Sequence, residues 1–165
     1  RDPTLRENFI ERVFCYRRWQ DVVQNGVTKQ ALVQFHTIHK YVLLAHHPQQ
    51  YEVLGRLVGQ AHRHRPKELA YRYGELFMKA LAVKATVRKH VNVLQHMLGH
   101  FKKRLDAHEK AELLGVIDDY HHGLTPRVVP LTLIKHYARI FDVRYIREQV
   151  YLNPHPKELM LRFQV

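Results

Sequence analysis

Apolar residues recur along this chain with the spacing of amphipathic helices. Between residues 84 and 105, plotted at about 100° per residue, the apolar side chains fall on one stripe, which predicts a helix that buries this stripe against a core. The stripe consists of Val87, Val91, Leu94, Leu98, Phe101 and Leu105. No segment shows the alternating pattern typical of strands, so the sequence predicts an all-α fold.

Prolines, glycines and capping residues divide the chain into helix-sized segments. A Thr4-x-x-Glu7 capping box and Thr28 mark two helix starts, and Pro66 and Pro130 are expected to open two others. We expect helices over about 3–24, 28–45, 48–62, from 66, 84–105, 106–120, from 130 and after 142, with a last helical turn or two over 157–163. These make seven or eight helices in a single compact bundle, with residues 1–165 as one domain.

The charge is strongly basic and unevenly distributed. Twenty-seven Lys and Arg against fifteen Asp and Glu give +12, which indicates a polyanionic partner. From Leu76 to Leu105 there is no Asp or Glu, although exposed helix faces usually mix signs because Glu–Lys pairs stabilise them. The polar side of the 84–105 helix therefore predicts an anion-docking surface.

Composition excludes several classes of chemistry. The chain contains no serine, which excludes every serine nucleophile. Its one cysteine, Cys15, can form neither an internal disulfide nor a thiolate cluster, and we expect it in the core. No apolar run is long enough to span a bilayer, so we expect a soluble, cytoplasmic protein. The start at Arg1 suggests a processed chain or an excised domain.

The histidines allow more than one interpretation. His39 points into an apolar stripe and is expected in the core, whereas His36, Lys40 and His47 share a polar face that can contact a ligand phosphate. His96 and His100 have the spacing of a metal-binding pair, but no carboxylate lies nearby in sequence, and anion contact is the better use. The alternative function is a histidine-based or metal-dependent enzyme acting on a nucleotide or phosphate ester, through His36, His96, His100 or His155.

Four segments carry a resemblance to a known family. They are HTIHKYVLLAH (36–46), KHVNVLQH (89–96), VPLTLIKHY (129–137) and YLNPHP (151–156), and with them the chain resembles the YbgA-like family, a domain of unknown function. The opening residues 5–14 resemble the junction found when this domain follows a thiouracil desulfidase-like domain. The resemblance implies that the partner domain removes sulfur while this domain presents tRNA containing 4-thiouridine. One cysteine cannot hold the partner's iron–sulfur cluster, so we expect binding rather than desulfidase activity here.

We therefore expect an RNA-binding domain, most of all for tRNA, with no catalytic residue, metal site or cofactor. The expected contacts are Lys40, His36, Lys84, Arg88, Lys89, Asn92, Gln95, His96, Lys102, Lys103, Lys135, His136 and Arg139, the last three and Lys40 on condition that the fold brings their helices alongside. A third interpretation is a protein-interaction module whose basic surface meets an acidic partner. In either case the first helix, with Glu7, Glu11 and Asp21, is the face expected toward a linked partner domain.

Overall fold

The computed structural model describes residues 3–157 and 159, and in this part of the chain helices are joined by turns and loops. It contains nine α-helices, eight of them seven residues or longer, and no strand, which confirms the all-α prediction. The elements are α1 (Pro3–Gln24), α2 (Lys29–Ile38), α3 (Lys40–His46), α4 (Pro48–Gly59), η1 (Ala61–Arg63), α5 (Pro66–Ala82), α6 (Val87–Gly99), α7 (Ala107–His121), α8 (Val128–Ile140), α9 (Arg144–Arg147) and η2 (Val150–Leu152). The turn expected over 157–163 lies almost wholly outside the described residues.

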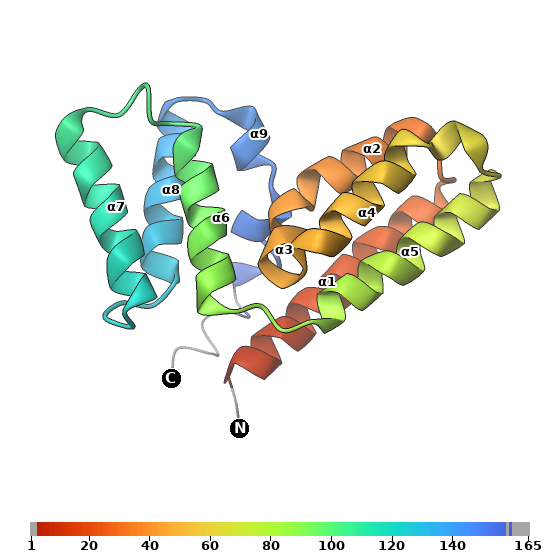
Figure 1. Ribbon diagram of the computed structural model, residues 1–165, viewed down its shortest axis with the longest axis horizontal. Helices are drawn as coiled ribbons and strands as arrows, with labels where there is room; N and C mark the ends of the chain where they lie inside the picture. Colours follow the sequence, from red (N-terminus) through yellow and green to blue (C-terminus); the bar gives the residue numbers. More distant parts are fainter. Residues whose placement is uncertain (1–2, 158, 160–165) are drawn as a thin grey trace.

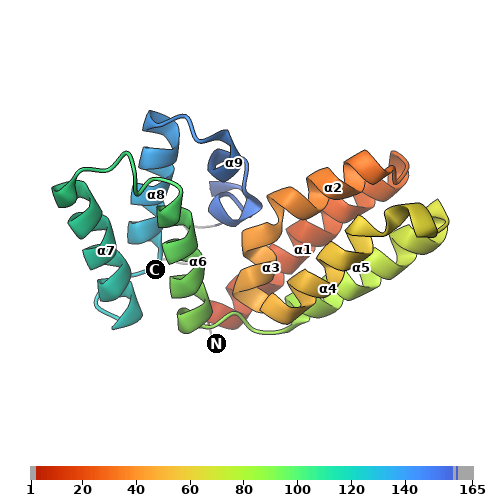
Figure 2. The same ribbon diagram turned by 45° about the horizontal axis from the view of Figure 1, so that its top comes forward.

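The helices form two groups that meet at α3 (Figure 1). One group contains α1 to α5, with the two longest helices, α1 and α5, side by side along one edge. The other contains α6, α7 and α8, with α9 at one end, and the turned view keeps this grouping (Figure 2). Helix α3 packs against α4 and α5 on one side and against α6 on the other. One hydrophobic core runs through both groups, from Cys15, which is fully buried as predicted, to Leu152.

Several helix starts follow the local signals in the sequence. Thr28 caps α2 as predicted, its Oγ1 accepting a hydrogen bond from the Ala31 amide at 3.0 Å. At α7, Asp106 and Glu109 form a reciprocal capping box. Helix α1 has the predicted bounds, and Gly26, with φ +88°, supplies the left-handed conformation that reverses the chain after it.

The helix predicted over 28–45 is divided into α2 and α3 at His39. This residue is completely buried, as predicted, and its ring stacks on Phe35 with centroids 3.9 Å apart. The His39 Nδ1–H donates to the Phe35 carbonyl oxygen at 2.7 Å, beside the backbone bond to the same oxygen. A side chain bonded into the backbone ladder bends a helix, and here the bend turns α3 toward α6.

Helix α6 is shorter than the predicted 84–105 helix and is buried on more than one side. It ends at Gly99, and turns carry Phe101 and Leu105 back into the core. Val87, which was expected in the buried stripe, is 46% exposed at the start of the helix. Because α6 packs against α3 as well as α7 and α8, residues outside the stripe are also buried, namely His90, Val93 and Met97. The start of α8 also differs from the prediction, because this helix begins at Val128, two residues before Pro130.

Candidate nucleic-acid interface

The exposed side of α6 carries Arg88, Asn92, Gln95 and His96, and we call it the α6 outer face. Arg88, Asn92 and His96 are four positions apart and Gln95 is next to His96, so the four predicted residues lie on one side of the helix. Lys102 and Lys103 are exposed in the turn after α6, not on the helix itself as predicted. No acid occurs between residues 76 and 105. The face therefore offers cationic and amide groups without a neighbouring carboxylate on the same element.

Lys40 lies beside the end of α6, as the prediction required. The start of α3, the end of α6 and α9 meet here, and we call the group Lys40, Tyr41, His100 and Tyr145 the junction. The Tyr41 Oη lies 3.2 Å from the His100 Nε2, and the His100 and Tyr145 ring centroids are 5.3 Å apart. The Lys40 Nζ lies 5.4 Å from the Tyr41 ring centroid and 5.9 Å from that of Tyr145. A cation and aromatic rings thus extend the α6 outer face across to α3 and α9.

Partial burial and the neighbouring positive charge favour the neutral form of His100. Partial burial, followed by the positive charges of Lys40 and His96, lowers the pKa of His100. A neutral imidazole both donates and accepts hydrogen bonds, and its ring is open to stacking. The end of α6 can therefore contact a base as well as a phosphate.

His36 is not a surface contact, contrary to the prediction. It is buried, its Nδ1 lies 2.9 Å from the Tyr73 Oη, and its ring stacks on Tyr51 at 4.9 Å. Burial lowers the pKa of His36 to about 4. Helical periodicity placed it on a polar face, but Tyr51 of α4 and Tyr73 of α5 cover that side of α2, so its role is structural.

The remaining predicted residues fall in three other places. The Lys89 Nζ donates to the His46 carbonyl oxygen at 2.6 Å and so ties α6 to α3. Lys84 and Lys135 line a pocket near the start of α6. His136 and Arg139 are exposed on α8, and no hydrogen bond, ion pair or ring contact among the described residues joins them to the α6 outer face.

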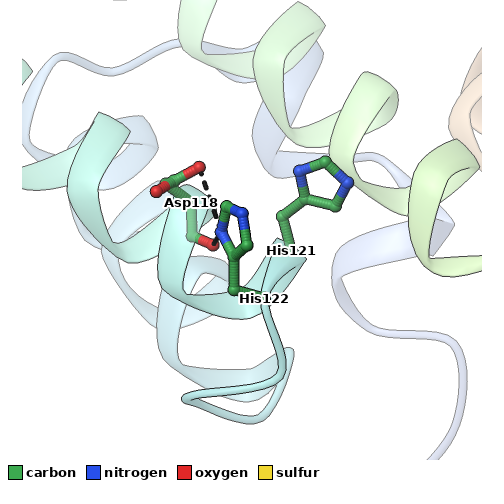
Figure 3. Close-up of side chains that lie close together, drawn as sticks. All are labelled: Asp118, His121 and His122. Carbon is green, nitrogen blue, oxygen red and sulfur yellow. Dashed lines mark hydrogen bonds and ion pairs between the residues drawn. The ribbon is translucent and has the colours of Figure 1, made fainter.

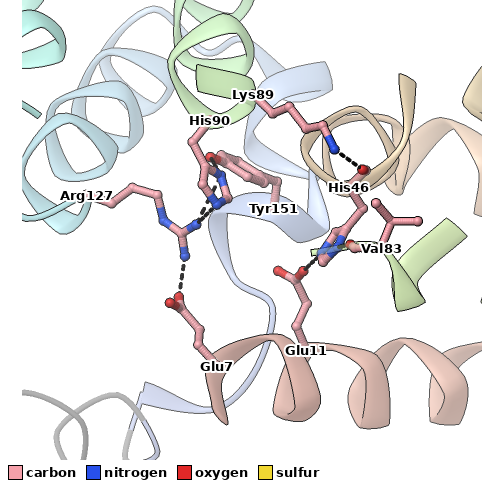
Figure 4. Close-up of polar contacts among 8 residues, drawn as sticks. All are labelled: Glu7, Glu11, His46, Val83, Lys89, His90, Arg127 and Tyr151. Carbon is pink, nitrogen blue, oxygen red and sulfur yellow. Dashed lines mark hydrogen bonds and ion pairs between the residues drawn. The ribbon is translucent and has the colours of Figure 1, made fainter. Parts of the chain in front are cut away.

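Behind α6 lies a partly buried polar cluster that was not expected from the sequence, made of Glu7, Glu11, His46, His90, Arg127 and Tyr151 (Figure 4). We call it the inner polar cluster. Glu11 and His46 form one half: the Glu11 Oε1 lies 2.5 Å from the His46 Nε2, and the His46 Nδ1 lies 2.6 Å from the Val83 carbonyl oxygen. Burial raises the pKa of Glu11, but the hydrogen bond and charge of His46 outweigh it, and the net pKa is lowered. This bond ties α1 to α3, and the His46 bond to Val83 ties α3 to the segment after α5.

Arg127 organises the other half of the inner polar cluster. Its guanidinium donates to the Glu7 carboxylate and to the His90 ring (Figure 4). The His90 Nδ1 in turn lies 2.8 Å from the Tyr151 Oη. Burial, with the nearby charge of Arg127, lowers the pKa of His90 to about 2, so this imidazole is neutral.

The cluster corrects the expected partner face of α1. Glu7 and Glu11 turn inward to Arg127 and His46, while Asp21 is exposed and pairs with Arg17 at 3.3 Å. The outward side of α1 is apolar instead, with Leu5, Phe9, Val13 and Tyr16 all about half exposed or more. The sequence contains two signals of the inner polar cluster: the i,i+4 spacing of Glu7 and Glu11, and the histidines inside segments 36–46 and 89–96. Only the fold brings these residues together.

Within the described residues, one group of three side chains has metal-ligand spacing, at the end of α7 (Figure 3). Asp118, His121 and His122 have ligand atoms within 4.8 Å of one another, and all three are exposed. The His122 Nδ1 lies 2.9 Å from the Asp118 carbonyl oxygen, an ordinary contact of a histidine at a helix C-terminus. His96 and His100 gain no third ligand from the described part of the chain.

Of the histidines of the enzymatic alternative, His96 and His100 are neighbours, whereas His36 and His155 contact other parts of the fold. His36 contacts Tyr73 of α5, His155 is buried with its ring 6.2 Å from that of Phe14, and His96 and His100 lie on α6 and at its end. Across residues 3–157 and 159, no helix combines the length and apolar composition needed to cross a bilayer.

Comparison with known proteins places the chain in a family. The family described as "Protein of unknown function (DUF1722)" matches residues 40–156. "Uncharacterized protein YbgA" of Escherichia coli strain K12 is 32% identical over 157 residues, which cover 94% of this chain and 93% of that protein. No solved structure matches the chain. On both matches, the chain belongs to the DUF1722, or YbgA-like, family.

Proposed function

We propose that this protein binds RNA, and tRNA above all, on the α6 outer face and the junction. The observation that carries the proposal is the continuity of these two surfaces: an acid-free exposed helix face ends beside Lys40 and the rings of His100 and Tyr145. Phosphate contacts give affinity, and unpaired bases of RNA are held by stacking and edge bonds. The proposed surface carries cationic side chains for phosphates beside the rings and amides that can contact bases.

Each part of the surface has a defined role in this proposal. Arg88, Lys102 and Lys103 neutralise backbone phosphates. Asn92 and Gln95 exchange hydrogen bonds with base edges, because a side-chain amide both donates and accepts. Tyr145 and His100 stack on a base that lies out of the helix, with Lys40 near the adjoining phosphate.

A partner domain completes the proposed activity. The resemblance to domains fused to thiouracil desulfidase-like proteins supports a role in presenting tRNA that contains 4-thiouridine to such a domain, in the same chain or in another. The exposed apolar side of α1 is the surface that we assign to it, since contiguous exposed apolar side chains mark protein contacts.

Charge reversal tests RNA binding directly. The double variant Arg88→Glu/Lys102→Glu should weaken tRNA binding by at least about tenfold, because two phosphate contacts become repulsive. Binding is measured by filter retention or fluorescence anisotropy at fixed salt. The matched control is Lys29→Glu/Arg72→Glu, which makes the same change in net charge at exposed positions of α2 and α5.

The control should bind nearly as well as the native protein, and both double variants should keep its melting temperature. Equal losses in the two variants would show that net charge alone, and not this face, attracts RNA. For the native protein, neutralisation of about four phosphates, by Arg88, Lys102, Lys103 and Lys40, gives a log–log slope of affinity against salt of roughly −2.8 to −3.6. A flat salt response contradicts the proposal.

A further inference from the structure

The end of α7 differs in charge from the rest of this basic chain. Residues 111–126 contain three acids, Glu112, Asp118 and Asp119, and neither Lys nor Arg. Asp118, His121 and His122 belong to this stretch, in the last turn of α7 and at its C-cap. A divalent cation bound there meets no Lys or Arg of the same segment, whereas the α6 outer face and the turn after it carry several.

The three side chains have a spacing that suits one metal ion (Figure 3). His121 and His122 come three and four positions after Asp118, and residues with these separations lie on the same side of a helix. One ligand atom from each lies within 4.8 Å of the other two. Zinc held by bonds of about 2.1 Å places tetrahedral ligands roughly 3.4 Å apart. All three side chains are exposed, so small rotations close this difference.

The backbone selects the tautomer of His122 that a metal requires. The His122 Nδ1 lies 2.9 Å from the Asp118 carbonyl oxygen, which can only accept, so Nδ1 carries the hydrogen. In the neutral ring the lone pair is then on Nε2, which is left to bind a metal. Metal-binding histidines usually donate their other ring N–H to an oxygen in this way, and the bond fixes the ring orientation. The Asp118 Oδ1 lies 3.4 Å from the same Nδ1, so the carboxylate is already beside the ring.

The helix end also favours a cation. Partial negative charge collects at the last carbonyl groups of a helix, and all three side chains stand in or directly after the last turn of α7. The Asp118 carboxylate adds a full negative charge at the same place. His96 and His100, by contrast, lie beside Lys40 and gain no third ligand from the described residues. The end of α7 is therefore the better metal site of the two.

We propose that Asp118, His121 and His122 bind one divalent transition-metal ion, with Zn²⁺ as the best fit. Two imidazoles and one carboxylate suit zinc, whereas Mg²⁺ and Ca²⁺ prefer oxygen ligands. Three protein ligands leave the fourth tetrahedral position to water. The ion joins the last turn of α7 to its C-cap and so holds the loop that leads to Arg127, the N-cap of α8. The site is distinct from the α6 outer face and does not depend on RNA binding there.

The test is calorimetric titration of the whole, untagged chain with zinc chloride at neutral pH, with magnesium chloride as the control ion. Zn²⁺ should bind with one-to-one stoichiometry, and Mg²⁺ should not bind. His121→Ala and His122→Ala should each weaken Zn²⁺ binding at least about tenfold, because each removes one of three ligands. The matched control is His108→Ala, exposed in the first turn of the same helix, which should bind Zn²⁺ like the native chain. His96→Ala, which removes one member of the α6 pair, should also have no effect.

Two further readouts separate this site from loose association. Mild acid should weaken Zn²⁺ binding, because protons compete for the histidine nitrogens. Zn²⁺ should raise the melting temperature of the native chain but not that of His121→Ala/His122→Ala, since a ligand of the folded state stabilises it. The proposal is overturned if this double variant binds Zn²⁺ like the native chain, if His96→Ala removes the binding, or if the native chain takes up no stoichiometric Zn²⁺. Arg88→Glu/Lys102→Glu should leave Zn²⁺ binding unchanged, so this outcome is independent of RNA binding.

Discussion

At the residue scale, single side chains decide how closely the helices approach one another. Trp19 of α1 is 4% exposed and packs between Phe35 and Tyr73, with ring centroids 5.1 and 5.0 Å away. Its indole lies directly over Gly74 of α5, where a Cβ atom would be 2.3 Å from the Trp19 Nε1. The absence of a side chain at residue 74 is therefore what lets α1 and α5 pack side by side.

Gly74→Ala should destabilise the protein by about 1–3 kcal/mol, the usual cost of forcing atoms into a packed core. Thermal unfolding followed through the fluorescence of Trp19, the one tryptophan of the chain, measures both stability and local packing. The matched control is Gly115→Ala in α7, where nothing lies within 4 Å of the added Cβ. It should keep or raise stability, by up to about 1 kcal/mol, because alanine favours the helix. Equal melting temperatures for the two variants would rule out the close approach as a constraint.

At the element scale, some helix starts could be predicted from sequence, whereas the end of α6 could not. Thr28 and Pro66 mark helix starts through chemistry that involves only their near neighbours. The predicted helix continues to residue 105, past the end of α6. Phe101 and Leu105 are buried whether the chain continues as a helix or turns back, and helical periodicity alone cannot separate these two cases. Sequence likewise reveals a candidate surface only where its residues lie close together in the chain.

The α6 outer face could be found from sequence because its residues lie within a few turns of one helix. The inner polar cluster could not, since its bonds join residues far apart in the chain, such as Glu7 and Arg127, 120 positions from each other. Local periodicity also placed His36 at the surface, although α5 supplies Tyr73 to cover it. Packing between helices that are distant in the chain forms the inner polar cluster and buries His36.

The capping box of α7 gives an element-scale prediction. Asp106→Ala should lower stability by about 1 kcal/mol, because the Asp106 side chain accepts from the Glu109 amide at 2.8 Å and no other group replaces it. Asp119→Ala removes the same charge from an exposed position inside α7 and should have a much smaller effect. Chemical denaturation of both variants provides the comparison, and similar losses would contradict the assigned cap.

At the scale of the whole molecule, the protein is basic outside and holds neutral histidines inside. Burial lowers the pKa of His36 to about 4, that of His39 to about 3 and that of His90 to about 2. Unfolding returns each ring to water, where its pKa is about 6.5. Below that pH the unfolded chain binds protons that the folded chain does not, so acid favours unfolding.

The free energy of unfolding should therefore fall as the pH is lowered from 6.5 toward 4, by up to about 1.4 kcal/mol per pH unit for each of these histidines. Glu11 acts in the same direction at lower pH, because its lowered pKa favours the folded state only while it is ionised. Urea unfolding between pH 7.5 and 4.5 measures the slope.

His39→Leu isolates one of these contributions. The variant should flatten the slope below pH 6.5, and it should also lower stability at neutral pH because the bond to the Phe35 carbonyl oxygen is lost. His108→Leu, exposed on α7, should keep the native slope. Identical pH profiles for native protein and His39→Leu would contradict the assignment of a buried neutral ring.

The bonds of α1 also have a consequence for synthesis. Besides Glu7 and Arg127, the Arg18 guanidinium donates to the Pro154 carbonyl oxygen at 2.8 Å, across 136 positions. A ribosome adds roughly 5–20 residues per second, so α1 emerges many seconds before these partners exist. During that interval Glu7 and Arg18 remain in water, and the growing chain can settle α1 against α2 and α5 first. The final polar contacts of the first helix thus close only when the last segments have been made.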